Sequence, residues 1–187
     1  MKAIIGVLFF GIMSGAFTPD SPETDKCQQE KAASNFDSSK FFSGTWYVTH
    51  AKKISTSVCH QFSTTINGDT VSVTADGYYE IGRKRDFYNV PCTGKITGGK
   101  FSLNCQPKKP TSTSKSTINV QVEVTVMETD NTKYALLYRC ATSGPHKTEN
   151  YLVIQRNENE DLPTLKSKVL SGKVISRKQS TNVCRKQ

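Results

Sequence analysis

Residues 41–49 read Phe-Phe-Ser-Gly-Thr-Trp-Tyr-Val-Thr, and this stretch predicts a β-strand that begins at a Gly-x-Trp motif. Further along, residues 128–140 read Glu-Thr-Asp-Asn-Thr-Lys-Tyr-Ala-Leu-Leu-Tyr-Arg-Cys, which predicts a turn between two strands. Just before that turn, every second residue from 118 to 126 is Ile or Val. Such a period of two is typical of a strand with two unlike faces. These three stretches predict a fold of antiparallel strands.

Turn signals divide the rest of the chain into further short strands. Asn67-Gly68-Asp69 predicts a hairpin between strands at 58–66 and 70–75, because Asn and Gly tolerate positive φ angles. Asp76-Gly77 is expected to end the second strand, and Pro91 indicates a bulge or an edge. The other strands are expected at 83–96, 101–105, 133–140 and 150–156. About eight strands with mostly short connections predict an all-β fold, an eight-stranded up-and-down antiparallel barrel, with a sandwich as the alternative.

A helix signal is present only after the last of these strands. Asp161 can cap a helix, Pro163 would lie in its first turn, and Gly172 would end it. Its apolar stripe would consist of Leu162, Leu165, Val169 and Leu170. We therefore expect a C-terminal flank helix that packs on the barrel.

The first sixteen residues have the pattern of an export signal. Lys2 supplies the charge, residues 4–12 supply the apolar stretch, and Ser14-Gly15-Ala16 is a small-residue cleavage pattern. Cleavage is expected after Ala16, with Thr18 as the alternative. Because the apolar stretch is too short to span a bilayer, we expect a secreted, extracellular protein with one domain at 17–187.

The chain has six cysteines, all of which follow the predicted signal: Cys27, Cys59, Cys92, Cys105, Cys140 and Cys184. An even number in an exported chain predicts three disulfides. Free thiols or a metal site are the alternative, but no Cys-x-x-Cys pair supports it. Six cysteines allow many pairings, so these residues alone do not choose among them.

The formal net charge of +9 suits anionic partners such as phospholipid surfaces, sulfated glycans or ligands with a carboxylate. Solubility alone is the competing explanation. The basic residues are spread along the sequence in small groups, and no nucleic-acid-binding motif accompanies them. These groups are Lys52-Lys53, Arg83-Lys84-Arg85, Lys108-Lys109, Arg177-Lys178 and Arg185-Lys186.

In their order and spacing, five stretches resemble the salivary lipocalins of blood-feeding triatomine bugs, in the group that includes pallidipin, triplatin and triabin. The matching stretches are 35–50, 58–59, 88–95, 129–140 and 150–156. The resemblance covers nearly the whole mature chain. It implies a lipocalin barrel that carries a ligand in its mouth, and saliva as the place where the protein is secreted.

The resemblance also implies specific structural roles. It implies the disulfides Cys27–Cys140, Cys59–Cys184 and Cys92–Cys105. Gly44, Trp46 and Arg156 resemble the residues at the closed end of a lipocalin, where the guanidinium stacks on the indole. Nitrophorins of the same group bind haem through a histidine on a barrel strand, but residues 75–79 contain none. We therefore expect no haem and no other cofactor.

The resemblance implies that the polar residues of strand 118–127 face the cavity and its valines face the flank helix. Arg139 would then point inward, where Glu123 or a ligand carboxylate could pair with it. A register shift of one residue would invert these assignments. The expected ligand-binding residues are Val48, His50, His60, Phe62, Glu123, Thr125, Met127, Leu137 and Arg139.

Catalysis is not expected from this sequence. The three histidines are His50, His60 and His146, and no serine-histidine-acid or cysteine-histidine arrangement can be argued from their positions. A metal bound by His50 and His60 would need a third ligand, so no metal site is expected.

Function is expected to lie in binding. The first hypothesis is inhibition of host haemostasis, through platelet aggregation, by sequestration of a small anionic lipid agonist such as thromboxane or another eicosanoid. The alternative is a protein- or anionic-surface-binding inhibitor of coagulation or the contact phase, of the kallikrein-kinin or thrombin type. A third hypothesis is a scavenger of biogenic amines or nucleotides. We expect a monomer that does not bind nucleic acid.

Overall fold

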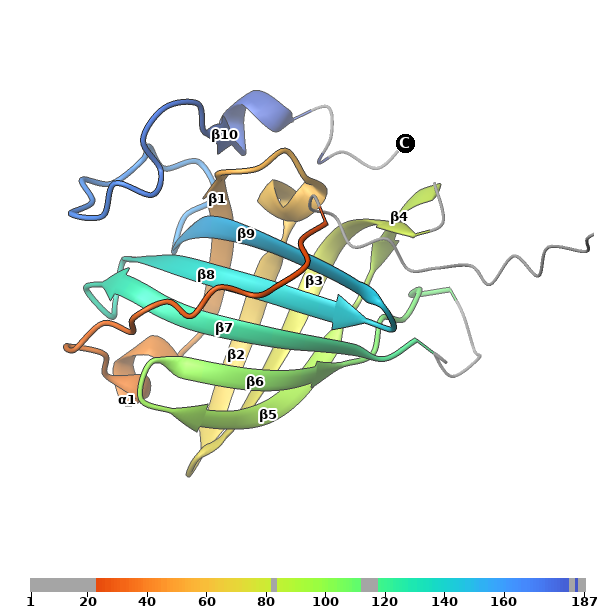
Figure 1. Cartoon of the computed structure of the whole chain (residues 1–187), viewed down its shortest axis with the longest axis horizontal. Coiled ribbons are helices and arrows are strands. Elements are labelled where there is room, and N and C mark those ends of the chain that lie inside the picture. Colours follow the sequence, from red (N-terminus) through yellow and green to blue (C-terminus); the bar gives the residue numbers. More distant parts are fainter. Residues whose placement is uncertain (1–22, 82–83, 112–117, 182–183, 185–187) are drawn as a thin grey trace, which may run out of the picture.

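The computed structural model describes residues 23–81, 84–111, 118–181 and 184. The predicted export signal lies outside these residues. Most of the described chain forms antiparallel strands, with two single turns of 3-10 helix, η1 and η2, and one short helix, α1 (Figure 1). The elements are α1 (Ser38–Phe41), β1 (Thr45–Ala51), η1 (Thr56–Cys59), β2 (Gln61–Asn67), β3 (Thr70–Ile81), β4 (Lys84–Tyr88), β5 (Pro91–Thr97), β6 (Lys100–Cys105), β7 (Val120–Thr129), β8 (Tyr134–Ser143), β9 (His146–Gln155), β10 (Ile175–Ser176) and η2 (Lys178–Ser180).

Eight strands close into a barrel in the order β1, β2, β3, β5, β6, β7, β8, β9, and the β1–β9 pairing completes the ring. All neighbouring pairs are antiparallel, so the predicted all-β barrel is confirmed and the sandwich is excluded. β4 pairs with the far half of β3, and β10 pairs with the end of β1. β4 and β5 thus share β3 as a partner, so the single strand expected at 83–96 is two strands, and the interruption falls just before Pro91, where a bulge or an edge was expected.

One end of the barrel is closed by aromatic side chains. The ring centroids of Phe41 and Trp46 are 5.1 Å apart, and those of Phe42 and Phe101 are 5.3 Å apart. The indole of Trp46 donates a hydrogen bond to the Phe41 carbonyl at 3.0 Å. The Arg156 guanidinium stacks on the same indole from outside, 3.5 Å from the ring centroid. We call this closed side of the barrel the floor end.

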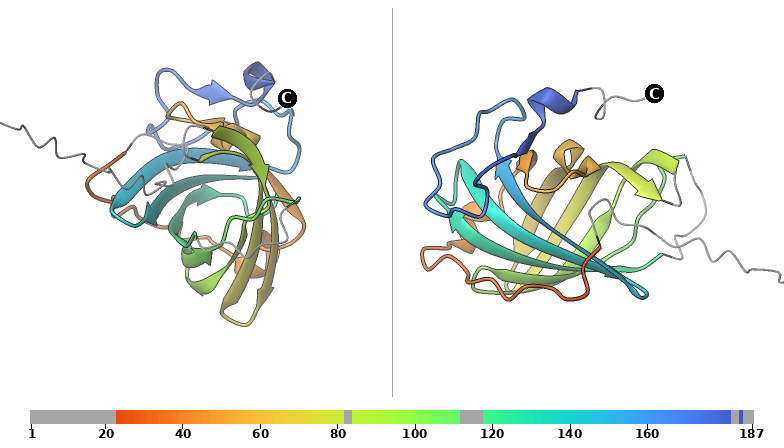
Figure 2. Two further views of the ribbon diagram at one scale, coloured as in Figure 1. Left: turned by 90° about the vertical axis from the view of Figure 1, so that its right-hand side faces the viewer. Right: turned by 45° about the horizontal axis from the view of Figure 1, so that its top comes forward.

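The three disulfides are Cys27–Cys140, Cys59–Cys184 and Cys92–Cys105, as the resemblance implied. The first ties the N-terminal arm, residues 23–37, to β8, and the second ties the C-terminal tail to η1. The third joins directly opposite residues of β5 and β6. The arm and the tail therefore lie against the outside of the barrel (Figure 2).

The predicted C-terminal flank helix is wrong. Residues 157–174 contain bends and turns but no helix. The Asp161 carboxylate, expected to cap that helix, pairs with Lys178 at 2.7 Å. Glu128 of β7 accepts hydrogen bonds from the backbone N–H groups of Lys166 and Ser167, so these groups bond to the barrel rather than to a helix.

The apolar residues of that segment still cover the barrel. Leu170 is buried against Leu136 and Val153, and Leu165 and Val169 pack against the same cluster. Leu162 remains exposed. The apolar pattern therefore predicted most of the residues of this segment that pack on the barrel, although the backbone of the segment is irregular. Among the described residues, no helix is long and apolar enough to cross a membrane.

Candidate functional site: an apolar cavity in the barrel

The barrel interior holds a cavity of about 100 Å³ that extends from the aromatic floor along the inner faces of the strands. Most of its lining is aliphatic or aromatic. The polar side chains that line it, among the described residues, include His60, Thr64, Tyr79 and Arg139, and none is a carboxylate. Ligand sites usually have volumes of roughly 300–1,000 Å³. The cavity is thus strongly apolar and small in this conformation.

The valines of β7 point into the cavity, which is the reverse of the expected orientation. Val120, Val122 and Val124 line the cavity, whereas Glu123 is exposed on the outer face. The alternating pattern identified two unlike faces, but both faces have the same period, so the pattern did not fix which face was inside. The observed orientation agrees with the usual apolar lining of ligand cavities. The expectation that Glu123 lines the barrel is therefore wrong.

Thr125 and Met127 also lie outside the cavity. Thr125 is opposite Tyr138, whose hydroxyl accepts a hydrogen bond from the backbone N–H of Gln28 in the arm. Met127 packs with the outer cluster around Leu136. Both residues belong to the face that the arm and tail cover, so their expected places in the cavity are wrong.

On β8, Leu137 and Arg139 line the cavity, in the orientation that was expected. Arg139 lies across from Val124, and Glu123 lies across from Cys140. Since neighbouring residues of a strand point to opposite faces, Glu123 and Arg139 lie on opposite sides of the barrel wall. The predicted pairing of Glu123 with Arg139 is therefore wrong.

On β1, a bulge separates the two residues that were expected in the cavity. Val48 is fully buried in the barrel core, opposite Ile154, while His50 pairs with Val153 after a register shift. Val153 belongs to the outer cluster, so the bulge turns His50 outward. His50 lies near Asp161 and Lys178 of the tail segment, and burial lowers its pKa. Neither side chain is among those that line the cavity.

His60 and Phe62 line the cavity, in the place that was expected. The His60 ring stacks on Tyr79 with centroids 4.1 Å apart, and its Nε2 lies 3.0 Å from the Tyr78 carbonyl oxygen. This stack depends on Gly77, because a Cβ there would lie 2.5 Å from His60 Cδ2. Gly77 was interpreted as the end of a strand, but β3 continues through it to Ile81.

His50 and His60 do not form a metal site together. They lie on different sides of the barrel wall, one facing the tail and the other facing the cavity. Within the ranges that the structure describes, no group of three His, Cys, Asp or Glu side chains could hold a metal ion.

Comparison with known proteins identifies relatives along most of the chain. The Triabin family model matches residues 16–168. Triafestin-1 of Triatoma infestans is 36% identical over 164 residues, which cover 83% of this chain and 79% of that protein. Platelet inhibitor triplatin-2 of the same species is 38% identical over 165 residues, which cover 85% of this chain and 84% of that protein.

Two solved structures show the same architecture. An LTBP1 mutant in complex with leukotriene C4 matches with a TM-score of 0.52 and 28% identity, over 72% of this chain and 79% of that chain. The tryptamine complex of the amine binding protein of Rhodnius prolixus matches with a TM-score of 0.65 and 20% identity, over 86% of this chain and 90% of that chain. The second likeness concerns the fold alone. With a family model that spans most of the sequence, the chain belongs to the Triabin family, the triatomine salivary lipocalins that its strand motifs resemble.

Proposed function

We propose that this protein is secreted in saliva and inhibits host platelet aggregation by sequestering a small anionic lipid, of the eicosanoid class, in its barrel. The observation that carries the proposal is the composition of the cavity. A cationic guanidinium on the wall, from Arg139, accompanies a mostly apolar lining with no carboxylate among the described residues. An eicosanoid has the complementary chemistry, a long hydrocarbon chain that carries a carboxylate.

The two parts of such a ligand would contact different parts of the cavity. A guanidinium can bind a carboxylate through two parallel hydrogen bonds, and such charge-assisted bonds are stronger than neutral ones. The hydrocarbon chain would pack against the aromatic floor, where Phe41, Trp46 and Phe101 line the cavity. Sequestration of this kind requires abundance and tight binding, not turnover, and we propose no enzymatic activity.

The cavity volume of about 100 Å³ means that the barrel must expand to hold such a lipid. It is smaller than the sites that usually hold drug-sized ligands. Lining side chains must therefore move when a lipid enters, and binding should be slower than a simple encounter. The leukotriene C4 complex of LTBP1 and the name of triplatin-2 support the choice of ligand class and of platelets.

Titration calorimetry with a stable thromboxane analogue and with leukotriene C4 tests the proposal. We expect one site per chain, a negative heat-capacity change from apolar burial, and behaviour as a monomer in gel filtration. Tryptamine serves as the control ligand, and we expect it not to bind because the described lining has no carboxylate to pair with an amine. Binding of tryptamine without binding of either lipid would contradict the proposal.

A second candidate is inhibition of a coagulation or contact-phase protein by the outer surface of the barrel. The small cavity favours this candidate, because a filled barrel can act through its exterior. Under it, the protein would prolong clotting or block contact activation while no eicosanoid bound in the calorimeter. Measuring both on one preparation separates the two candidates.

A further inference from the structure

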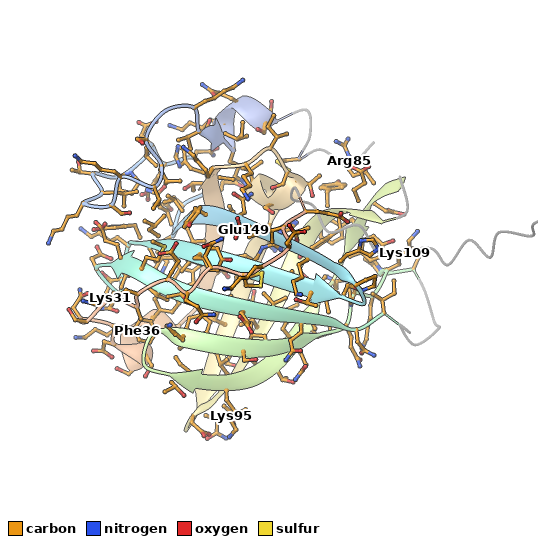
Figure 3. The ribbon with its side chains drawn as sticks, in the orientation of Figure 1. Lys31, Phe36, Arg85, Lys95, Lys109 and Glu149 are labelled. Atoms are coloured by element: carbon orange, nitrogen blue, oxygen red, sulfur yellow. A yellow bond between two sulfur atoms is a disulfide. The ribbon has the colours of Figure 1, made fainter. Side chains whose placement is uncertain are left out.

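The N-terminal arm crosses the outside of the barrel over β9, β8 and β7 in turn (Figure 1). Glu23 forms a β-bridge to β9, and the N–H of Ala33 donates to a carbonyl of β7 at 2.8 Å. Figure 3 shows Glu149 of β9 beside this arm. Residues 135–138 of β8, which lie beneath the arm and the segment 157–174, are buried on both faces of the barrel wall.

The exposure of β6 is different. Its outward residues, Ser102 and Asn104, are exposed, whereas Phe101, Leu103 and Cys105 are buried and line the cavity. The cover of the barrel is therefore uneven, because side chains of β8 are held from both sides and those of β6 from the inside.

The arm covers the part of β8 from which Arg139 enters the cavity. Arg139 lies directly opposite Asn150 of β9, and the ladder residues on either side of this pair point outward. We call these four outward residues the outer frame. Its two opposed pairs are Tyr138 with Tyr151 and Cys140 with Glu149.

Two members of the outer frame are tied directly to side chains of the arm. Cys140 forms a disulfide with Cys27. The hydroxyl of Tyr151 donates to the carboxylate of Glu30 at 2.6 Å. One tie is made on β8 and the other on β9, so the arm holds both strands beside Arg139.

The other two members are joined to each other through the hydroxyl of Tyr138. This hydroxyl accepts a hydrogen bond from the backbone N–H of Gln28 at 2.6 Å and donates to the carboxylate of Glu149 at 2.8 Å. Glu149 also accepts a hydrogen bond from the ammonium group of Lys53 at 2.9 Å. Tyr138 is only 2% exposed, so its hydroxyl links the arm, β8 and β9 at a buried point.

We infer that Tyr138 is a positioning residue for Arg139, and that through its hydroxyl the arm holds the wall from which the guanidinium reaches the ligand carboxylate. The inference rests on the proposed function and deepens it, because it adds to the ligand site a residue and a segment that lie outside the barrel. Two parallel hydrogen bonds from a guanidinium require accurate placement. Since the barrel must expand to hold a lipid, the outer frame keeps Arg139 in place while other parts of the wall move.

Calorimetry on Tyr138→Phe tests the inference, with the stable thromboxane analogue as the probe. The variant lacks only a hydroxyl, and binding should weaken about threefold to tenfold, which is part of the loss expected when the whole guanidinium is removed. The second probe is the same analogue with its carboxylate reduced to a primary alcohol. It should bind Tyr138→Phe and the unmodified protein equally, because it has no charge to pair with Arg139.

The matched control is Tyr134→Phe, which removes a hydroxyl from the same face of β8 near its start. That hydroxyl donates to Glu128 at 3.5 Å, away from the outer frame. The control should bind the analogue as tightly as the unmodified protein. The NMR signal of the Arg139 Nε–H group should shift in Tyr138→Phe and stay in place in Tyr134→Phe.

Tyr151→Phe provides a second variant of the outer frame. It removes the hydrogen bond to Glu30, so we expect the same pattern of losses as for Tyr138→Phe. Melting temperatures verify that each variant is folded. If Tyr138→Phe does not fold, Tyr151→Phe decides the question by the same measurements.

A double-mutant cycle separates positioning from a general effect on structure. If Tyr138 acts through Arg139, Tyr138→Phe should cause no further loss of affinity in the Arg139→Ala protein. An equal loss in both backgrounds, an equal loss for the acid and the alcohol, or unchanged affinity would overturn the inference.

The same cycle distinguishes this inference from the proposed function. Full affinity in Arg139→Ala, or no binding of the analogue to the unmodified protein, would end the proposed role of Arg139 and the inference with it. A loss in Arg139→Ala without a loss in Tyr138→Phe would overturn the inference alone.

Discussion

Arg139 and Val124 face each other across the β7–β8 ladder, and both side chains line the cavity. Glu123, one residue away, lies on the outer surface. A carboxylate of β7 therefore does not accompany Arg139 into the barrel. Arg139 therefore presents its guanidinium on a cavity wall formed by valines, where the proposed function has it bind the ligand carboxylate.

Arg139→Ala should weaken the binding of a carboxylate-bearing lipid about tenfold to a hundredfold, which corresponds to about 1.5–3 kcal/mol for a charge-assisted hydrogen bond. Arg139→Lys should rescue only part of the affinity, because lysine retains the charge but lacks the planar fork. Calorimetry with the same lipid measures both variants.

Glu123→Gln provides the matched control for Arg139. Its side chain is exposed on the outer face of β7, so we expect unchanged affinity and unchanged melting temperature. A folded Arg139→Ala protein that binds the lipid as tightly as the unmodified protein would end the ligand role of this residue. A loss of affinity in Glu123→Gln would contradict the register of the β7–β8 ladder.

Arg156 is expected to stabilise the floor end. Besides the stack on Trp46, its guanidinium donates to the Thr132 carbonyl at 3.0 Å and to the Thr45 carbonyl at 3.1 Å. Arg156→Ala should lower the free energy of unfolding by about 2–3 kcal/mol, since it removes a cation–π contact and leaves carbonyls without a donor. Denaturant titration measures this, and a loss below 0.5 kcal/mol would contradict a sealing role.

Haem should not bind in the barrel. The one histidine in the described lining is His60, whose ring stacks on Tyr79 and whose Nε2 lies 3.0 Å from a backbone oxygen. An axial ligand to iron must instead present a ring nitrogen to the metal. We expect no stable Soret band after ferric haem is mixed with the protein and passed through gel filtration. A persistent band that disappears in His60→Ala would show that this histidine can turn toward the metal.

Gly77→Ala should displace His60 from the cavity wall. The added Cβ would lie 2.5 Å from His60 Cδ2 and 3.1 Å from the Cys59 carbonyl, so the ring or the backbone must shift. We expect lower stability and altered His60 and Tyr79 side-chain NMR signals. Gly68→Ala is a control for glycine replacement without a contact, although its positive φ brings backbone strain. Unaltered His60 signals would mean that the site has more room than its geometry indicates.

The barrel could be predicted from sequence because its signals are local. Period-two alternation at 118–126 and the Asn67-Gly68 turn each depend on a few neighbouring residues. The orientation of the β7 face could not be predicted, since both faces of an alternating strand have the same period. Only the folded barrel, in which Leu137 of β8 and Ile154 of β9 line the same cavity, shows that the valines are inside.

The missing helix and the grouping of connections at one end of the barrel illustrate a second limit. The segment after β9 has a helical spacing of apolar residues, but its backbone bonds to Glu128, which is distant in sequence. Likewise, Lys53, Arg85 and Lys108 are separate in the sequence, and only the antiparallel topology brings their connections to one end. Such long-range relationships are absent from any local pattern.

The last prediction concerns acid stability and Glu149. Burial of the Glu149 carboxyl raises its pKa, but hydrogen bonds from Lys53 at 2.9 Å and from the Tyr138 hydroxyl at 2.8 Å outweigh burial, so the net pKa lies below its ordinary value of 4.5. A carboxyl whose pKa is lower in the folded state stabilises the protein above the unfolded pKa, and this contribution is lost as pH falls through the folded pKa.

Glu149→Gln should therefore be less stable near neutral pH by about 1–2 kcal/mol, and the difference should shrink below pH 4.5. Melting curves from pH 7 to pH 3 measure this, with Glu123→Gln as the exposed control. A Glu149→Gln deficit that stayed constant with pH would show that the carboxylate charge has no role in holding the arm and β1 to β9.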